Sequence, residues 1–343
     1  MSTPKQTVFL SGATGFIAQH IIKQLLDSKK FKVIGSVRSE EKANSLAENF
    51  KSPDLSFVYV KELADPTAFD ESFAKIGSEL DYIIHSASPV ILTADDVEKT
   101  IIDPARNGSS GIFKAALKYA PNLKHFVLTS SSASVADEKT KDFPDVVFSE
   151  SSWNPVTFEE GVNVDGCAYF YAKKSAEELV WKLAKENKVK FGVTSVCPSY
   201  VFGPQAFDVT AKKDVNFSAG IVTNYIKTTV NDPVGTNYYG FCIDVRDVAR
   251  AHIEPLLNSE KFNGERLYMV TGTYGEQDIV DTLNTIPELK GKIAVGTPHR
   301  DDDIQNRIAK CDNSKTRKLL GFEFISVEQS ILDTAQQVLK VSK

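Results

Sequence analysis

Thr7-Val-Phe-Leu-Ser11-Gly12-Ala-Thr-Gly15-Phe-Ile-Ala18 is the stretch of this 343-residue chain that decides its fold. It opens on an apolar run that predicts a short buried strand, and helical spacing follows in Ile17, Ile21, Ile22, Leu25 and Leu26. Between strand and helix, Gly12 and Gly15 let the backbone turn tightly and approach a diphosphate, which binds the free amides of a helix N-terminus. Such a turn also suits a plain strand-to-helix connection. Its place at the start of a repeating strand and helix pattern favours nucleotide binding.

The rest of the chain continues this alternation. Strand-like runs separated by helical segments recur at 31–37, 55–60, 82–85, 125–129 and 191–197. They predict an α/β fold, a Rossmann-type doubly wound parallel sheet, over a dinucleotide-binding domain at 1–204. Beyond this point the alternation weakens, so residues 205–343 are expected to form mainly a smaller C-terminal substrate-binding lobe. Parts of 240–275 are expected to return to the first domain.

The end of the second strand bears on cofactor choice. In a dinucleotide fold this position meets the adenosine ribose, where an acidic residue favours NAD. This chain instead offers Ser36 and then Arg38, whose guanidinium suits the 2′-phosphate of NADP. The alternative is that Arg38 and Lys42 are solvated charges paired with Glu40 and Glu41.

Tyr169 and Lys173 stand four residues apart at the start of a segment with helical spacing. Residues four apart lie one turn above each other, so the ammonium of Lys173 is placed to favour proton loss from the phenol of Tyr169. Tyr169 is therefore a candidate proton donor. The alternative is a half-buried aromatic on an amphipathic helix, with Lys173 and Lys174 on its solvent edge.

Polar residues at three further places are candidates for the same site. Ser130-Ser-Ser-Ala-Ser134 follows the fifth strand, at the edge where open α/β sheets bind ligands, although serine clusters also make turns. His85 ends the fourth strand, where packing against the backbone is the more common role. Asn107 lies inside the helix expected at 97–119 and either faces the site or marks a kink. Residues 137–166 are expected to form a long polar loop at the rim.

Composition limits the classes of function. A net charge of −5 argues against a nucleic-acid surface, so a small-molecule partner is expected. No segment approaches the roughly 20 apolar residues of a membrane span, and the apolar run near the N-terminus is too short for a signal peptide. The four cysteines form no Cys-x-x-Cys pair, which predicts no metal site and reduced thiols in the cytoplasm. A monomer and a homodimer both stay open.

The glycine turn, the serine run and the Tyr169/Lys173 pair, in this order and spacing, resemble the extended short-chain dehydrogenase/reductases. Within them the chain is similar to the dihydroflavonol-reductase-like branch, and most of all to fungal NADPH-dependent methylglyoxal/isovaleraldehyde reductases. The likeness covers nearly the whole chain. Supporting stretches are Ser11–His20, His85-Ser-Ala-Ser-Pro89, Val127–Ser131, Ser151-Ser-Trp-Asn-Pro155, Tyr200–Pro204, Ile243–Ala249 and Lys318–Phe322.

The resemblance implies roles for individual residues. Ser131 takes the position of the catalytic serine, Tyr169 that of the acid/base and Lys173 that of the lysine on the nicotinamide ribose, while Asn107 matches the proton-relay asparagine. Implied cofactor contacts are Gly12, Ala13, Thr14, Gly15, Phe16, Ile17, Arg38, Lys42, Glu62, Leu63, Ala87, Tyr169, Lys173, Pro198, Val201 and Ser218. Glu62 replaces the usual aspartate at the adenine. Ser132 and Ala136 replace bulkier residues of relatives, which leaves substrate size open.

The predicted function is NADPH-dependent reduction of aldehydes and ketones, such as methylglyoxal, isovaleraldehyde and aryl or keto-ester ketones, to alcohols. A sugar-nucleotide epimerase or dehydratase shares the fold and the Ser/Tyr/Lys set, but it needs a basic diphosphate pocket in the second lobe. The region 224–240 is poor in arginine. A non-catalytic NADP-sensing protein would be expected to lack the Tyr/Lys pair.

Overall fold

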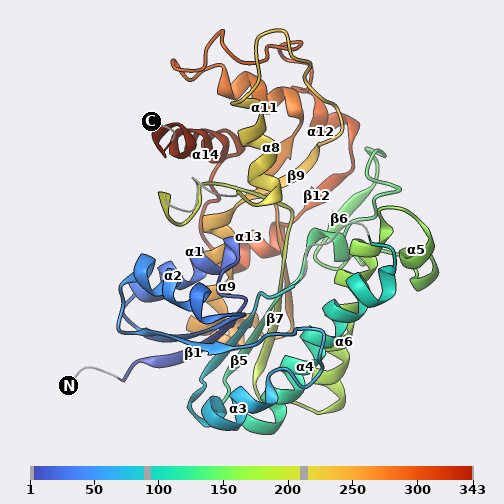
Figure 1. Cartoon of the computed structure of the whole chain (residues 1–343). Helices are drawn as coiled ribbons and strands as arrows, with labels where there is room; N and C mark the ends of the chain where they lie inside the picture. Colours follow the sequence, from blue (N-terminus) through green and yellow to red (C-terminus); the bar gives the residue numbers. More distant parts are fainter. Residues whose placement is uncertain (1–3, 89–93, 209–214, 342–343) are drawn as a thin grey trace. The chain divides into compact units, whose positions relative to one another are not determined.

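The computed structural model describes residues 4–88, 94–208 and 215–341, so Pro89 of the family-like stretch at 85–89 lies outside it. Its main sheet has seven strands in the order β10-β7-β5-β4-β1-β2-β3. Their bounds are β1 (Gln6–Ser11), β2 (Phe31–Val37), β3 (Leu55–Tyr59), β4 (Tyr82–His85), β5 (His125–Thr129), β7 (Gly192–Pro198) and β10 (Glu265–Met269). Strands β1, β5 and β7 of this sheet are labelled in Figure 1. The pairs from β3 through β7 are all parallel. The predicted Rossmann-type α/β fold is confirmed.

Strands β2 and β3 lie on one side of β1, and β4, β5 and β7 lie on the other. The direction in which strands are added to the sheet therefore reverses at β1. The switch point between β1 and β4 is where open α/β sheets bind ligands, beyond the carboxyl ends of the strands. In register, Ser11 pairs with His85 at those ends. The glycine turn and residues 86–88 therefore emerge side by side.

Two compact units divide the chain. The first comprises 1–137, 151–197 and 249–267, and the second comprises 138–150, 198–248 and 268–343. Helical elements of the first unit are α1 (Phe16–Asp27), α2 (Glu40–Phe50), α3 (Asp70–Ile76), η1 (Gly77–Glu79), η2 (Glu98–Ile102), α4 (Asp103–Tyr119), η3 (Ser132–Ser134), α5 (Phe158–Asn163), α6 (Cys167–Glu186) and α10 (Ser259–Phe262). Helix α9 (Val245–Leu257) runs from the second unit into the first.

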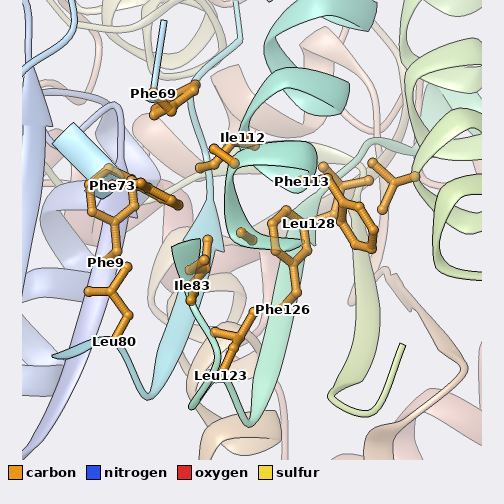
Figure 2. Packing of buried hydrophobic residues seen from close by; sticks show 14 of the residues in the cluster. Phe9, Phe69, Phe73, Leu80, Ile83, Ile112, Phe113, Leu123, Phe126 and Leu128 are labelled. Carbon is orange, nitrogen blue, oxygen red and sulfur yellow. The ribbon is translucent and has the colours of Figure 1, made fainter. Parts of the chain in front are cut away.

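Aromatic side chains fill the core between the sheet and helices α3, α4 and α6 (Figure 2). Phe9 of β1 meets Phe73 of α3 edge to face, with ring centroids 4.8 Å apart. Phe113 of α4 meets Phe126 of β5 in the same way at 5.0 Å. All four rings are fully buried. Pairs of this kind add about 0.5–1.5 kcal/mol beyond their burial, so they fix α3 on β1 and α4 on β5.

The second unit is built on two small sheets. Its elements are β6 (Val147–Ser149), β8 (Tyr200–Phe202), α8 (Phe217–Tyr225), β9 (Gly240–Asp244), β11 (Gly272–Tyr274), α11 (Glu276–Leu283), α12 (Ile304–Arg307), β12 (Lys310–Asp312), α13 (Ser314–Leu320) and α14 (Val327–Val341). One sheet has the order β11-β9-β8, and β12 pairs with β6 in the other. Its core contains Phe202, Tyr274 and Ile331.

Three local expectations differ from the structure. The region 137–166, expected as a loop, contains β6 and α5, because β6 pairs with the distant β12 and α5 is closed by a Thr157/Glu160 capping box. The helix expected at 97–119 begins with the π-helical turn η2. The first unit also leaves the main run at residue 197 and not at 204, and 138–150 groups with the second unit. The returning segment, 249–267, lies within the expected 240–275. The role of the second unit as a substrate lobe stays a prediction.

Within the described ranges, no helix combines the length and the apolar character that crossing a membrane requires.

Candidate active site

The turn after β1 requires glycine at its first position. Gly12 has a φ of +70°, and a Cβ there would lie 2.9 Å from the Cα of Ala87. A side chain would therefore meet backbone as well as an unfavourable dihedral. Gly15 is the N-cap of α1 and offers no side chain to the amides of the first helical turn. The close approach and the uncapped amides fit a diphosphate.

Two serine hydroxyls hold this turn in place. Ser11 Oγ accepts hydrogen bonds of 3.0 Å from the amides of Ser86 and Ala87, which fixes the chain after β4. Ser36 Oγ accepts from the amide of Gly12 at 3.0 Å, and the amide of Ala13 donates to the Ser36 carbonyl at the same distance. Ser36 thus shapes the turn from β2, a role that the sequence did not indicate.

His85 is a buried structural residue. Its Nδ1 lies 2.8 Å from Ser11 Oγ, and its ring packs edge to face on Phe69. Burial, and to a smaller extent the nearby charge of Lys173, lowers the pKa of His85 to about 3. The imidazole is therefore neutral near pH 7 and poorly suited to acid/base work there, which agrees with a strand-end histidine packed in the fold.

The other residues of the turn are arranged around these contacts. Ala13 is fully buried beneath the turn, whereas Thr14 is exposed and its carbonyl accepts from Gln19 Nε2 at 2.9 Å. Phe16 is half-buried and meets His20 edge to face at 5.7 Å between ring centroids. Ile17 is half-buried in the first turn of α1. The exposed backbone is thus on the side of Thr14 and Gly15.

Arg38 and Lys42 are exposed at the end of β2 and in the first turn of α2. Within the described ranges neither forms an ion pair, so the alternative of pairing with Glu40 and Glu41 finds no support. Ser39 caps α2 by accepting from the amide of Lys42 at 3.4 Å. Both cations therefore remain available for an anionic group.

Glu62 and Leu63 follow β3. Glu62 is exposed, and its Oε1 accepts from the amide of Ala64 at 3.1 Å. Leu63 packs on α4, where a Cβ on Gly108 would come 2.8 Å from its Cγ. Asn107, beside that glycine, is half-buried, and no partner of its carboxamide is found among the described residues. Its carboxamide is therefore able to hydrogen-bond a ligand or water.

Helix α6 is oriented by a stripe of small residues. Ala168, Ala172 and Ala176 are buried against Ile101, Ile102 and Ala105 of η2 and α4. This packing leaves Tyr169 half-buried and puts its ring 6.0 Å from the Nζ of Lys173, measured to the ring centroid. The predicted helix and the predicted proximity of Tyr169 and Lys173 are confirmed.

Lys173 is 8% exposed, and in the described parts of the chain it has no ion pair. An ammonium on a buried side chain that lacks a counter-ion among the described residues is suited to a ligand that brings hydrogen-bond acceptors. The charge of Lys173 is also felt at His85, which lies at the switch point.

The contacts distinguish the serines after β5. Ser130 and Ser134 turn into the core, where their hydroxyls lie 2.5 Å and 2.6 Å from Glu177 Oε2. Ser131 is 8% exposed, and its Oγ accepts from the amide of Ala133 at 3.1 Å. The hydroxyl proton of Ser131 thus stays available for a ligand, whereas Ser132 is half-buried in η3.

Comparison with known proteins identifies the family of this chain. A model of the family described as "NAD dependent epimerase/dehydratase family" matches residues 8–270. The chain belongs to this family.

Two relatives and one solved structure in the family are especially similar. An uncharacterized oxidoreductase of Saccharomyces cerevisiae is 42% identical, over 97% of this chain and 98% of the relative. The NADPH-dependent methylglyoxal reductase GRE2 of the same yeast is 41% identical, with the same coverage. The crystal structure of yeast methylglyoxal/isovaleraldehyde reductase Gre2 complexed with NADPH has a TM-score of 0.93 and 41% identity, and covers 98% of this chain and 99% of that one. The predicted resemblance is confirmed.

The remaining family-implied cofactor residues, Pro198, Val201 and Ser218, lie in the second unit. Pro198 ends β7 and is buried, and Val201 of β8 pairs with Ile243 of β9. Ser218 Oγ donates to the carbonyl of Val201 at 2.5 Å. The structure thus brings Val201 and Ser218 together, and their contact with a cofactor stays a prediction.

Sequence reasoning missed Glu177, the carboxylate to which Ser130 and Ser134 turn. It is completely buried and paired with Arg266, whose Nε lies 2.7 Å from its Oε1. One signal was available: Glu177 falls among the apolar positions of α6, four residues after Lys173. An acid at such a position must have partners, but only the fold shows that they are these serines and Arg266.

Proposed function

We propose that this chain is an NADPH-dependent carbonyl reductase that converts aldehydes and ketones to alcohols. The observation that carries the proposal is the buried side chain of Lys173, whose ammonium lies 6.0 Å from the ring centroid of Tyr169 and has no ion pair within the described structure. Support comes from the 41% identity, over nearly the whole chain, to a protein named NADPH-dependent methylglyoxal reductase.

The residues present fit a dinucleotide. The turn at Gly12 has no room for a side chain, and the amides at the start of α1 are uncapped, so this turn would hold the diphosphate. Arg38, with Lys42 beside it, would bind the 2′-phosphate that distinguishes NADPH from NADH. Lys173 would bind hydroxyls of the nicotinamide ribose, which satisfies its buried charge.

When bound, NADPH supplies the hydride that the carbonyl carbon accepts. The protein's part is to orient the carbonyl and to deliver one proton to its oxygen. In the proposal, Ser131 and Tyr169 both donate hydrogen bonds to that oxygen as negative charge develops on it. Tyr169 then transfers its phenolic proton, which completes the alcohol, and the ammonium of Lys173 stabilises the phenolate left behind. Asn107 is assigned to the water path that returns a proton to Tyr169.

The epimerase alternative makes a different use of the same residues. An epimerase or dehydratase acts on a sugar nucleotide, which requires cationic groups for a second diphosphate. The likeness to reductases along nearly the whole chain favours carbonyl reduction. Small to medium carbonyls are the proposed substrates, in particular methylglyoxal, isovaleraldehyde and aryl or keto-ester ketones. We also propose a cytoplasmic location, with small molecules as the only partners and either a monomer or a homodimer as the assembly.

The test measures NADPH oxidation over aldehydes, 1,2-dicarbonyls, aryl ketones and sugar nucleotides, with NADPH binding followed separately by fluorescence. Turnover of several small carbonyls and none of the sugar nucleotides is expected. Sugar-nucleotide conversion with retained cofactor would instead establish an epimerase. Binding of NADPH without any turnover would establish a sensing protein.

A further inference from the structure

Glu177 is the centre of a buried polar network in the first unit. Its side chain is completely buried in α6. Groups from four other places contact its two oxygens: Ser130 and Ser134 after β5 at 2.5 Å and 2.6 Å, Ser195 of β7 at 2.6 Å, Trp181 of α6 at 3.2 Å and Arg266 of β10 at 2.7 Å. A single carboxylate therefore ties α6 to the turn after β5 and to the two neighbouring strands, β7 and β10.

The network is charged. Burial opposes ionisation of Glu177, but the charge of Arg266 and the hydroxyls of Ser130 and Ser134 outweigh it and hold the pKa of this carboxyl below its usual value. Arg266 is itself fixed, because its guanidinium stacks 3.8 Å from the ring centroid of Trp153 and its Nη1 donates to the carbonyl of Ser152. Buried ion pairs of this type often add little net stability compared with apolar packing, so the main effect of this pair is the geometry that it imposes.

The position of Glu177 along α6 relates it to the candidate catalytic residues. It lies four residues after Lys173 and eight after Tyr169, so the three side chains follow one face of the helix. Through Oε2 it holds Ser130 and Ser134, which stand on either side of Ser131 in the chain. The helix that carries the phenol therefore also holds the turn that carries the serine hydroxyl.

Asn154 fixes the other end of the same turn. Its Nδ2 donates to the carbonyls of Ala133 at 3.0 Å and Ala136 at 2.6 Å, and its amide donates to the carbonyl of Ser134 at 3.0 Å. These contacts limit the outward movement of the turn. Unlike the hydrogen bonds to Glu177, they do not connect the turn to α6.

From this geometry we propose that Glu177 is a positioning residue, which sets the Ser131 hydroxyl relative to the Tyr169 phenol for carbonyl reduction. The proposal rests on the proposed function and adds to it a residue that touches neither substrate nor cofactor. Misplacement of a reacting group by about 1 Å can cost on the order of 10²-fold in rate. Loosening the link between Glu177 and the turn should therefore lower kcat while leaving NADPH affinity intact.

The main variant is Ser134→Ala, and its matched control is Ser195→Ala. Both serines are fully buried and both lie 2.6 Å from an oxygen of Glu177, but only Ser134 belongs to the turn with Ser131. We expect Ser134→Ala to lower kcat about tenfold or more, with the KM for NADPH within about twofold, and Ser195→Ala to keep kcat within about twofold. Equal losses of kcat would overturn the proposal, because the network would then be only structural. Glu177→Gln is less suitable, since it leaves Arg266 buried without its anion.

A double-mutant cycle with Ser131→Ala separates positioning from general damage. If Ser134 acts through Ser131, its removal should cost little further kcat once the Ser131 hydroxyl is gone. Fully additive losses in the double variant would contradict the proposal.

Hydrogen exchange needs no substrate, so it tests the positioning role of Glu177 independently of the proposed function. Hydrogen exchange of the amides at 133–136 should be faster in Ser134→Ala than in Ser195→Ala, because only the first variant frees the turn. If the wild-type protein reduces no carbonyl, the proposed function fails and exchange still decides whether Glu177 holds the turn. Equal exchange in the two variants would overturn the positioning role.

Discussion

The turn after β1 is held by neutral hydroxyls, whereas the turn after β5 is held by a buried ion pair. Ser11 and Ser36 fix the first turn through backbone amides, and its close approach to Ala87 depends on the missing side chain of Gly12. The second turn is fixed through the hydroxyls that flank Ser131, which contact the Glu177/Arg266 pair. The first arrangement keeps backbone amides open for an anion. In our proposal, the second arrangement uses a buried ion pair to orient the hydroxyl of Ser131. Such an arrangement is expected where the position of a reacting group matters more than the strength of binding.

Because different groups hold the two turns, a substitution should be able to lower kcat without changing NADPH affinity. We expect Tyr169→Phe to do so most strongly. The aromatic ring and its packing remain, and only the phenolic hydroxyl, the candidate proton donor, is lost. We expect kcat to fall by about 10² to 10⁴-fold while NADPH affinity changes little. Steady-state kinetics together with NADPH fluorescence titration checks both values. Turnover within threefold of the wild-type value would remove Tyr169 from the role of acid.

Ser131→Ala should have the next largest effect, because it deletes the hydroxyl that the second turn presents. A loss in kcat on the order of 10²-fold is expected, with a smaller change in KM, since the hydrogen bond strengthens as the carbonyl oxygen gains charge. Ser132→Ala is the control, as Ser132 belongs to the same turn and has no assigned role. Should Ser132→Ala lower kcat as much, the serine has been assigned to the wrong position.

Gly12→Ala tests the steric basis of the first turn, and Gly166→Ala is its control. Both glycines have positive φ, at +70° and +82°, but only a Cβ at Gly12 meets neighbouring backbone, while nothing lies within 4 Å of one at Gly166. The left-handed dihedral alone costs about 1–2 kcal/mol, so Gly166→Ala should lose about 1 kcal/mol of unfolding free energy and Gly12→Ala about 2 or more. Urea unfolding measures the difference. Equal losses would show that the approach to Ala87 is not important for stability.

Arg38→Ala should have the smallest effect of the four, and it is confined to cofactor choice at the end of β2. A charge-assisted hydrogen bond to the 2′-phosphate is worth about 1.5–3 kcal/mol, so the KM for NADPH should rise about tenfold or more. The KM for NADH should stay within about threefold, and the sensitivity of NADPH use to added salt should fall because a screened ion pair has been removed. Lys42→Ala is expected to act in the same direction but more weakly. Equal losses with both cofactors would place Arg38 at the adenine or in the fold.

Local pattern was sufficient for the parts of the site that lie within one element. The strand, glycine turn and helix at the N-terminus are contiguous, and their apolar spacing can be read directly. Tyr169 and Lys173 are four residues apart on one helix, so helical geometry alone brings them together. Ser131 follows a strand of the same sheet, and the parallel order places that strand's end at the ligand edge. For these features the sequence by itself determined both the fold class and the candidate residues.

The tertiary structure alone decided which serine faces the site and what holds it. Three serines stand in a row, and nothing in their spacing shows that Ser130 turns inward while Ser131 does not. That choice depends on Glu177 and on Arg266, which lies 89 residues further along the chain. The short strand β6 likewise exists through its pairing with the distant β12, and both strands belong to the second unit. Contacts of this kind carry no local period, because their partners are selected by packing and charge in the folded chain and not by their spacing in the sequence.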